Sequence, residues 1–182
     1  MRTSRRLSLV AALMLLGGTA WSGRAQAPPS SGELGDLDGT YRLTSGHESL
    51  RRGIERAVRG LNFFIRGFAR TEIRRSVQPE QSVEIQARGA ERVAVRLGAW
   101  TSPAVSVQGP AVRVTGSDGD VSRFRAQRSG SGLYLRSETD RGTRESWLRP
   151  ELEPGALWMQ VRITSPQLPV PIQYDLRYER AP

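Results

Sequence analysis

The chain has 182 residues, with 27 basic and 18 acidic side chains and a formal net charge of +9. All of the basic side chains are arginines, there is no cysteine, and there is one histidine. This composition excludes a disulfide framework and a zinc site built from several cysteines or histidines, so the core alone must stabilise the fold.

The first part of the chain has the pattern of an export signal. Arg5 and Arg6 lie in a basic start, an apolar run covers 7–18, and small residues up to Ala27 form a cleavage pattern. The apolar run is shorter than the roughly 20 residues that a membrane-spanning helix needs. We therefore predict a signal peptide over 1–27 and a periplasmic or secreted mature protein. The paired arginines also fit a twin-arginine signal, which is the alternative to the favoured Sec route.

Residues 28–37 are rich in proline, serine and glycine, and we expect a flexible linker there. A single domain is predicted over 38–182, a length that can bury a sizeable core. It begins with a strand in which Tyr41 and Leu43 alternate with polar neighbours. Removal of the signal with its four arginines leaves a net charge of +5, which favours acidic ligands or anionic lipid surfaces. For an exported protein we expect no nucleic-acid partner.

A helical segment is predicted over 46–75, starting after Ser45 and Glu48, which have the spacing of a capping box. A straight helix of this length would measure roughly 43 Å at 1.5 Å per residue, longer than the about 39 Å expected across the domain. We therefore expect a bend or a break, with Gly60 capping the end of a first helix and Asn62 the start of a second.

This helical segment is apolar on one side and rich in arginine on the other. The favoured interpretation is that the apolar side packs on the sheet while the arginines are solvated, with Arg59 near Glu55 and Arg70 near Glu72. The alternative is a helix that lies on an anionic membrane, for which the exposed Phe63 is the main sign. The residues assigned to this membrane or partner surface are Arg52, Arg56, Arg59, Phe63, Arg66 and Arg70.

Beyond Pro79 the spacing of apolar residues changes from threes and fours to twos, which predicts strands over 82–180. In the final run, Tyr174 and Leu176 share one face and Asp175 lies on the other. Short turn sequences separate about 8–10 strands, so the sheet should be an antiparallel meander. Closure into a barrel would remove its exposed edges. We therefore predict a mainly β fold, a β-barrel with a helical lid, and the alternative is a two-sheet sandwich.

This order of elements resembles the lipocalin and fatty-acid-binding-protein superfamily of calycin-like β-barrels, in which a helix pair follows the first strand and covers one barrel mouth. Residues 39–41, Gly-Thr-Tyr, are similar to the Gly-X-Trp motif of the first strand, and residues 178–180, Tyr-Glu-Arg, are similar to the end of the last strand. In the fatty-acid-binding branch, an arginine two positions before the last-strand tyrosine holds the ligand carboxylate. Leu176 occupies that position here, and this departure from the family pattern favours a neutral apolar ligand or lipid.

The predicted ligand-binding residues are the inward-facing side chains of the strands and two phenylalanines of the helical segment. They are Phe64, Phe68, Val83, Ile85, Val95, Phe124, Leu135, Met159, Val161, Tyr174, Leu176 and Tyr178. The alternative is that these side chains fill the barrel, and that the protein is a structural or interaction protein of the bacterial envelope that acts through its arginine-rich surface.

The sequence gives little support to catalysis. His47 is the only histidine, and we expect it to be a partly exposed residue at the start of the helix. The aspartate pairs in DLDG and GSDGD indicate turns, since neither continues into a calcium loop. We therefore expect no metal, no cofactor and no enzymatic activity. An enzyme with an unrecognised site is the least favoured hypothesis, and polar groups converging in a cavity would support it.

We expect the three tryptophans of the strand region to be packing residues and not binding residues. Trp100 lies near a turn and is expected at a barrel mouth. Trp147 and Trp158 fall on the face opposite the neighbouring aliphatic residues, which predicts outward side chains unless a bulge turns them.

Overall fold

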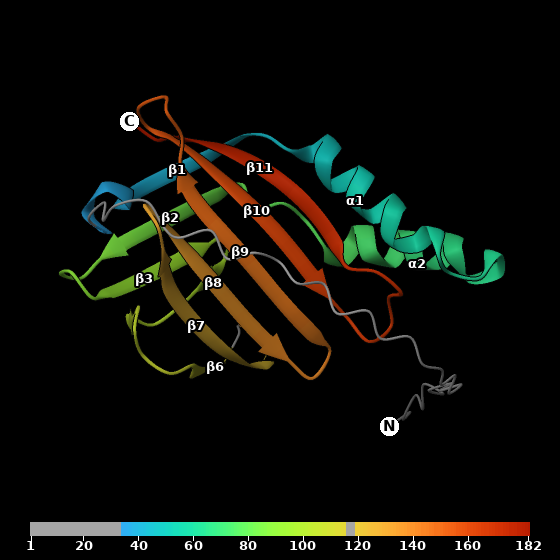
Figure 1. The fold of residues 1–182 in the computed structure, drawn as a ribbon. Helices are drawn as coiled ribbons and strands as arrows, with labels where there is room; N and C mark the ends of the chain where they lie inside the picture. Colours follow the sequence, from blue (N-terminus) through green and yellow to red (C-terminus); the bar gives the residue numbers. More distant parts are fainter. Residues whose placement is uncertain (1–33, 116–118) are drawn as a thin grey trace, which may run out of the picture.

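The computed structural model describes residues 34–115 and 119–182, in which a short helical turn, one strand and two helices precede ten further strands (Figure 1). The helical elements are η1 (Leu34–Leu37), α1 (His47–Arg59) and α2 (Phe63–Ser76). The strands are β1 (Gly39–Ser45), β2 (Ser82–Ala87), β3 (Arg92–Leu97), β4 (Trp100–Thr101), β5 (Val105–Ser106), β6 (Val112–Thr115), β7 (Val121–Ser129), β8 (Gly132–Thr139), β9 (Gly142–Pro150), β10 (Ala156–Thr164) and β11 (Ile172–Arg180).

The predicted signal peptide over 1–27 lies outside the described residues, as do residues 28–33 of the predicted linker. The last four residues of that linker, Leu34–Leu37, form η1, and Leu34 and Leu37 are buried in the core. For these four residues the prediction of a flexible linker is wrong, because two leucines in one helical turn find an apolar surface to cover.

All strands belong to one antiparallel sheet with the order β4-β3-β2-β1-β11-β10-β9-β8-β7-β6, and β5 pairs with the same edge of β3 as β4. Pairing of β1 with β11 brings the two ends of the domain together in the middle of the sheet. The sheet is strongly curled (Figure 1). As a result, β5 lies near β7. Within the described residues no ladder joins β4 or β5 to β6, so the predicted mainly β fold is confirmed as a half-barrel that is open between these strands.

The period-two pattern decides which side chains enter the core. On β11 the alternate residues Ile172, Tyr174, Leu176 and Tyr178 are buried, whereas Asp175 between them is exposed. The same alternation on the neighbouring strands makes the concave side of the half-barrel dry and leaves its convex side facing water.

Tyr41 and Arg180 join the two motifs that carry the family resemblance. The Arg180 guanidinium lies 5.1 Å from the centre of the Tyr41 ring and donates a hydrogen bond of 2.9 Å to its hydroxyl oxygen. Arg180 also donates to the carbonyl oxygens of Asp36 and Asp38, and the Tyr41 hydroxyl donates to that of Leu37. This network fastens η1 to the paired first and last strands.

The predicted break between two helices is confirmed. Asn62 is the N-cap of α2, and its side-chain oxygen accepts a hydrogen bond of 3.1 Å from the Phe64 amide. The predicted capping box is wrong, because Ser45 belongs to β1 and α1 starts after Gly46 without a side-chain cap. Gly46 has φ 132°, and a Cβ there would lie 2.5 Å from Leu176, so only glycine fits this sharp turn from strand to helix.

The two helices pack very differently. One face of α1 is buried against β11, and its Gly53 allows close contact with the strand. In contrast, no residue of α2 is fully buried, and only Ala69 and Ile73 pack partly against the core. Neither α1 nor α2 has the length and apolarity of a membrane-spanning segment.

Candidate functional site

A cavity of about 450 Å³ lies on the concave side of the half-barrel. Its apolar walls come from both sides of the opening in the ladder, with Leu97 and Trp100 on one side and Phe124 and Leu135 on the other. The rings of Trp100 and Phe124 meet edge to face at 5.0 Å and so bridge strands that share no hydrogen bond. The volume lies within the range of pockets that bind small molecules.

Polar side chains also line this cavity. They are Ser76 at the end of α2, Glu80 in the segment before β2, Ser137 on β8, and Arg144 and Ser146 on β9. Because Ser146 and Leu148 are buried, the alternation along β9 places Arg144 on the same concave face.

Glu80 and Arg144 form an ion pair inside the cavity. The distance from Arg144 Nη1 to Glu80 Oε1 is 2.5 Å, and the two side chains are 28% and 11% exposed, respectively. The segment that carries Glu80 is held in place by Tyr178, whose hydroxyl donates a hydrogen bond of 3.1 Å to the Glu80 carbonyl oxygen. The pair therefore joins β9 to the segment between α2 and β2 across the cavity.

Several polar atoms of the Glu80–Arg144 pair and of Tyr174 have no contact with solvent and no hydrogen-bond partner among the described residues. They are Glu80 Oε2, Arg144 Nε, Arg144 Nη2 and the Tyr174 hydroxyl. Nη1 of Arg144 is used by Glu80, so Nε and Nη2 remain as the side-on edge of the guanidinium, which is the edge that binds a carboxylate through two parallel hydrogen bonds. Since buried polar groups are almost always paired, this unpaired edge is an unusual feature of the cavity lining.

Burial and charge set the protonation states around the pair. Burial raises the pKa of Tyr174 to about 12. The positive charge of Arg144 lowers this pKa in part, and the negative charge of Glu80 raises it further. Burial and the Glu80 carboxylate also raise the pKa of Tyr178. Although burial disfavours its charge, the Glu80 carboxylate raises the pKa of Arg144. At neutral pH the two tyrosines are therefore uncharged and the arginine is charged.

The predicted ligand-binding residues divide into three groups. Phe124 and Leu135 line the cavity. Eight others are buried as predicted but pack the core and are not part of the cavity lining: Val83, Ile85, Val95, Met159, Val161, Tyr174, Leu176 and Tyr178. Phe64 and Phe68 are 89% and 75% exposed on α2, so their assignment to the ligand-binding wall is wrong.

The orientation of α2 explains this error. Its inner side carries Arg66, Ala69, Arg70 and Ile73, which recur at the spacing of one helix face. Arg66 donates hydrogen bonds of 2.9 and 3.0 Å to the carbonyl oxygens of Arg59 and Leu61, at the end of α1. Because arginines occupy the side that faces α1, the phenylalanines lie on the opposite side.

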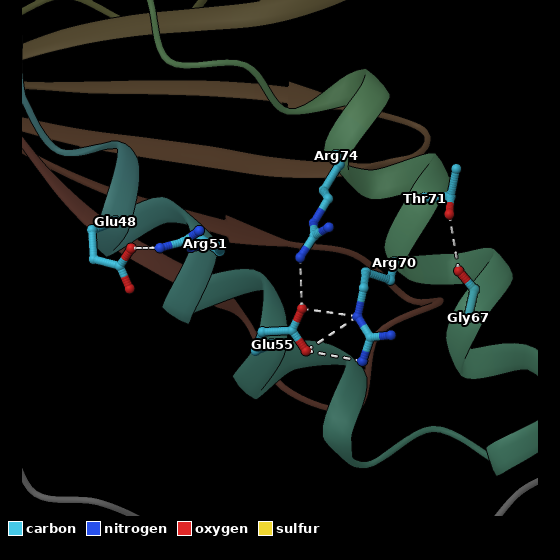
Figure 2. Close-up of polar contacts among 7 residues, drawn as sticks. All are labelled: Glu48, Arg51, Glu55, Gly67, Arg70, Thr71 and Arg74. Atoms are coloured by element: carbon cyan, nitrogen blue, oxygen red, sulfur yellow. Dashed lines mark hydrogen bonds and ion pairs between the residues drawn. The ribbon is translucent and has the colours of Figure 1, made fainter.

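Glu55 of α1 accepts hydrogen bonds from two arginines of α2. Figure 2 shows its carboxylate between Arg70, at 2.8 to 3.1 Å, and Arg74, at 3.0 Å. The predicted pairs of Arg59 with Glu55 and of Arg70 with Glu72 are therefore wrong. Within the assigned membrane or partner surface, Arg52, Arg56, Arg59 and Phe63 are exposed, whereas Arg66 and Arg70 turn toward α1.

The exposed residues of α2 form an apolar patch, which we call the α2 phenylalanine surface. It consists of Phe63, Phe64, Ile65 and Phe68, with exposed fractions of 78%, 89%, 53% and 75%. Large apolar side chains so exposed on one short helix indicate an interaction surface more than a packing surface.

Sequence reasoning missed Glu80, Arg144 and the serines of the cavity. The alternation along β9 that turns the Leu148 side chain inward also turns Arg144 inward. The inward position of this arginine could therefore have been predicted from the sequence. Glu80 lies outside the strands and had no such signal. Trp100, which was expected at a barrel mouth, is part of the cavity lining. Trp147 and Trp158 are half-buried on the convex face, where Trp147 packs on Tyr134 at 5.2 Å.

Other features bear on catalysis and metals. His47 is exposed on α1, away from the cavity lining. The part of the chain that the structure describes holds no group of three or more potential metal ligands.

No protein-family model matches the chain, and no curated protein sequence is similar enough to match. Solved structures do match. Lipid binding protein 8 of Caenorhabditis elegans is 10% identical with a TM-score of 0.50, and the match covers 81% of this chain and 96% of that one. A Schistosoma mansoni fatty acid binding protein in complex with arachidonic acid is 14% identical with a TM-score of 0.50, over 83% of this chain and all of that one.

A secretory abundant heat soluble protein from Ramazzottius varieornatus is 7% identical with a TM-score of 0.53, and the match covers 83% of this chain and 98% of that one. The fold is therefore that of the fatty-acid-binding proteins and related calycin-like β-barrels, with a strongly curled antiparallel sheet. At these identities the likeness concerns the fold.

Proposed function

We propose that this protein binds a small apolar ligand or lipid that has an acidic head group. The single observation that carries the proposal is that Arg144, whose Nε and Nη2 atoms are buried and unpaired, lines a cavity walled by Leu97, Trp100, Phe124 and Leu135. An apolar chain would cover these walls, and a carboxylate would satisfy the two unpartnered nitrogens. The names of two structural neighbours, a lipid binding protein and a fatty acid binding protein in complex with arachidonic acid, support the same class of ligand.

This proposal revises the expectation of a neutral ligand. That expectation rested on Leu176, which is buried in the core as predicted. The structure supplies an arginine from a different strand, because Arg144 of β9 reaches the cavity. The arginine is therefore on β9 and not on the last strand, where the fatty-acid-binding branch has it. With an arginine in the cavity, the expected ligand is acidic and not neutral.

The test compares decanoate binding by the native protein, Arg144→Met and Arg162→Met. Arg162 is a convex-face arginine on β10 whose nearest carboxylate contact is 3.8 Å, so its replacement is a matched loss of one charge. We expect Arg144→Met to weaken decanoate binding by about 10- to 100-fold, as for a lost hydrogen bond to a charged group, and Arg162→Met to leave it unchanged. Equal binding by all three proteins would refute the role of Arg144.

A second candidate function is contact with an anionic membrane, favoured by the α2 phenylalanine surface. The exposed arginines of α1, Arg52, Arg56 and Arg59, lie on the neighbouring helix and would attract lipid phosphates. In this arrangement the apolar ligand passes between the bilayer and the cavity. The alternative of a filled envelope protein is less well supported, since it does not account for the cavity.

We propose that the protein is exported to the periplasm or secreted and is not an enzyme. The export signal pattern of 1–27 supports the first statement. Polar groups do converge in the cavity, but Ser137 and Ser146 have no histidine beside them, since His47 is the only one in the chain and lies elsewhere. A ligand that pairs with the remaining nitrogens of Arg144 would use this site without a chemical reaction.

A further inference from the structure

The cavity is electrically neutral before a ligand binds. Glu80 and Arg144 contribute one charge of each sign, and the other residues lining the cavity are serines and apolar side chains. Tyr174 and Tyr178 of β11 interact with the pair and remain uncharged at neutral pH. Among the described lining residues, none from α2, β3, β4, β7 or β8 is ionisable, so these four groups define the electrostatics of the site.

A carboxylate at the free edge of Arg144 would add a second negative charge. It would share one guanidinium with Glu80, whose Oε2 is shielded from solvent and has no hydrogen-bond partner. Two carboxylates that share a poorly solvated site do not both remain ionised, and one of them takes a proton. Two ionised carboxylates can only accept hydrogen bonds, so they cannot bond to each other. Once one of them is protonated, its O–H can donate a hydrogen bond to the other.

We propose that the cavity takes up an acidic amphiphile together with one proton from the solvent, and that Glu80 is the reason for this coupling. This inference rests on the proposed function, since it concerns the same site. The proton is shared between the ligand carboxyl group and Glu80. The complex then carries Arg144, one carboxylate and one neutral carboxyl group, and it keeps the zero net charge of the empty cavity.

The coupling fixes the sign of the pH dependence. Because the complex holds one proton more than the separated protein and ligand, affinity falls as pH rises. The change is about tenfold per pH unit over the range in which the free carboxyl groups are ionised and the complex keeps its proton. A neutral ligand of the same chain length brings no charge and shows no such dependence.

Isothermal titration calorimetry tests the coupling with decanoate and 1-decanol at pH 7, in buffers that differ in their enthalpy of ionisation. The dependence of the observed heat on that enthalpy gives the number of protons taken up. We expect about one proton for each decanoate and none for 1-decanol. In Glu80→Gln, Arg144 and decanoate neutralise each other, so proton uptake should fall close to zero while decanoate still binds.

Glu84→Gln is the matched control, because Glu84 is paired with Arg96 at 3.1 Å on the convex face of β2. It should keep the uptake of about one proton. Decanoate binding without proton uptake by the native protein would overturn the coupling and leave the proposed function intact. Full uptake in Glu80→Gln would overturn the role of Glu80. If neither probe binds, the proposed function fails and the coupling fails with it.

A second measurement avoids dependence on the variant. Between pH 6 and pH 8, the affinity of the native protein for decanoate should fall by about 100-fold, whereas that for 1-decanol should stay constant. A decanoate affinity that does not change over this range overturns the inference even if Glu80→Gln does not fold.

Discussion

The carboxylate of Glu55 accepts hydrogen bonds from both Nε and Nη2 of Arg70, and this contact joins α2 to α1 (Figure 2). Arg74 adds a further bond to the same carboxylate. No residue of α2 is fully buried, so these polar contacts supplement a limited apolar packing. The helix that carries the α2 phenylalanine surface is therefore joined to α1 by ion pairs as well as by the partial packing of Ala69 and Ile73.

Replacing Glu55 by glutamine should loosen α2. We expect hydrogen exchange of the α2 amides to become about three- to tenfold faster, as for the loss of a small surface ion-pair network, while exchange in the sheet stays constant. Glu48→Gln is the control, because it removes a Glu48–Arg51 pair within α1 that does not reach α2. Equal effects of the two variants would contradict the role of Glu55.

Acid should have the same effect as this substitution. The hydrogen bond from Arg70 lowers the pKa of Glu55 below its ordinary value of 4.5. A lowered pKa means that the stabilisation is complete above the ordinary value and is lost as pH falls through the value in the folded protein. Exchange of the α2 amides, corrected for the intrinsic pH dependence, should therefore rise below about pH 4.5 in the native protein and much less in Glu55→Gln. A rise of equal size in both would count against this assignment.

Close packing of α1 on β11 depends on Gly53. A Cβ at this position would lie 2.4 Å from the carbonyl oxygen of Gln173, so Gly53→Ala must push the helix away from the strand. We expect a loss of about 1–3 kcal/mol in the free energy of unfolding, measured by denaturant titration. Gly67→Ala in α2 is the control. A Cβ there meets nothing within 4 Å, and alanine should stabilise by about 0.5–1 kcal/mol.

The α2 phenylalanine surface should decide membrane binding. The double variant Phe64→Ser and Phe68→Ser should weaken binding to vesicles of anionic phospholipid by at least about tenfold, because two large apolar side chains no longer enter the bilayer. The melting temperature should hardly change, since both side chains are exposed in the protein. Leu152→Ser removes an exposed leucine between β9 and β10 and should leave vesicle binding intact. Unchanged binding by the double variant would rule out this surface.

The hydroxyl of Tyr41 should contribute more to stability than that of Tyr134. Tyr41→Phe removes the acceptor for Arg180 and the donor to Leu37 in a buried position, which should cost about 1–3 kcal/mol of unfolding free energy. Tyr134→Phe removes a half-buried bond of 2.7 Å to Glu145 and should cost about 1 kcal/mol or less. Denaturant titration of both variants measures the difference, and a larger cost at Tyr134 would contradict the assigned role of the Tyr41 network.

Local patterns were enough to predict much of this fold. Alternation by twos identified the buried face of β11, and the side-chain oxygen of Asn62 identified the start of α2. The rotation of α2 was not predictable in the same way. It depends on the Glu55 carboxylate, which Arg70 reaches in space, and on the Arg59 carbonyl oxygen, which Arg66 reaches. A helix with apolar and charged sides has two ways to face its neighbour, and here the arginines face inward.

Of the two charged residues of the cavity, one was predictable from its own strand and the other was not. The inward position of Arg144 follows from the alternation along β9, but its partner Glu80 lies before β2, in another part of the chain. Nothing in the spacing of these residues indicates a pair. The curl of the sheet brings them together, so the chemistry of the site is a property of the tertiary structure.

The aromatic contact between Trp100 and Phe124 crosses a line where the sheet has no backbone hydrogen bonds. Between paired strands, a wider lumen would require the loss of backbone hydrogen bonds. Between β4 and β7 it would require only the separation of the Trp100 and Phe124 rings. We therefore expect that one aromatic substitution changes the volume of the cavity without loss of any strand pairing. Variants with smaller side chains at these two positions are the natural starting point for altering which ligand lengths the proposed binding site would accept.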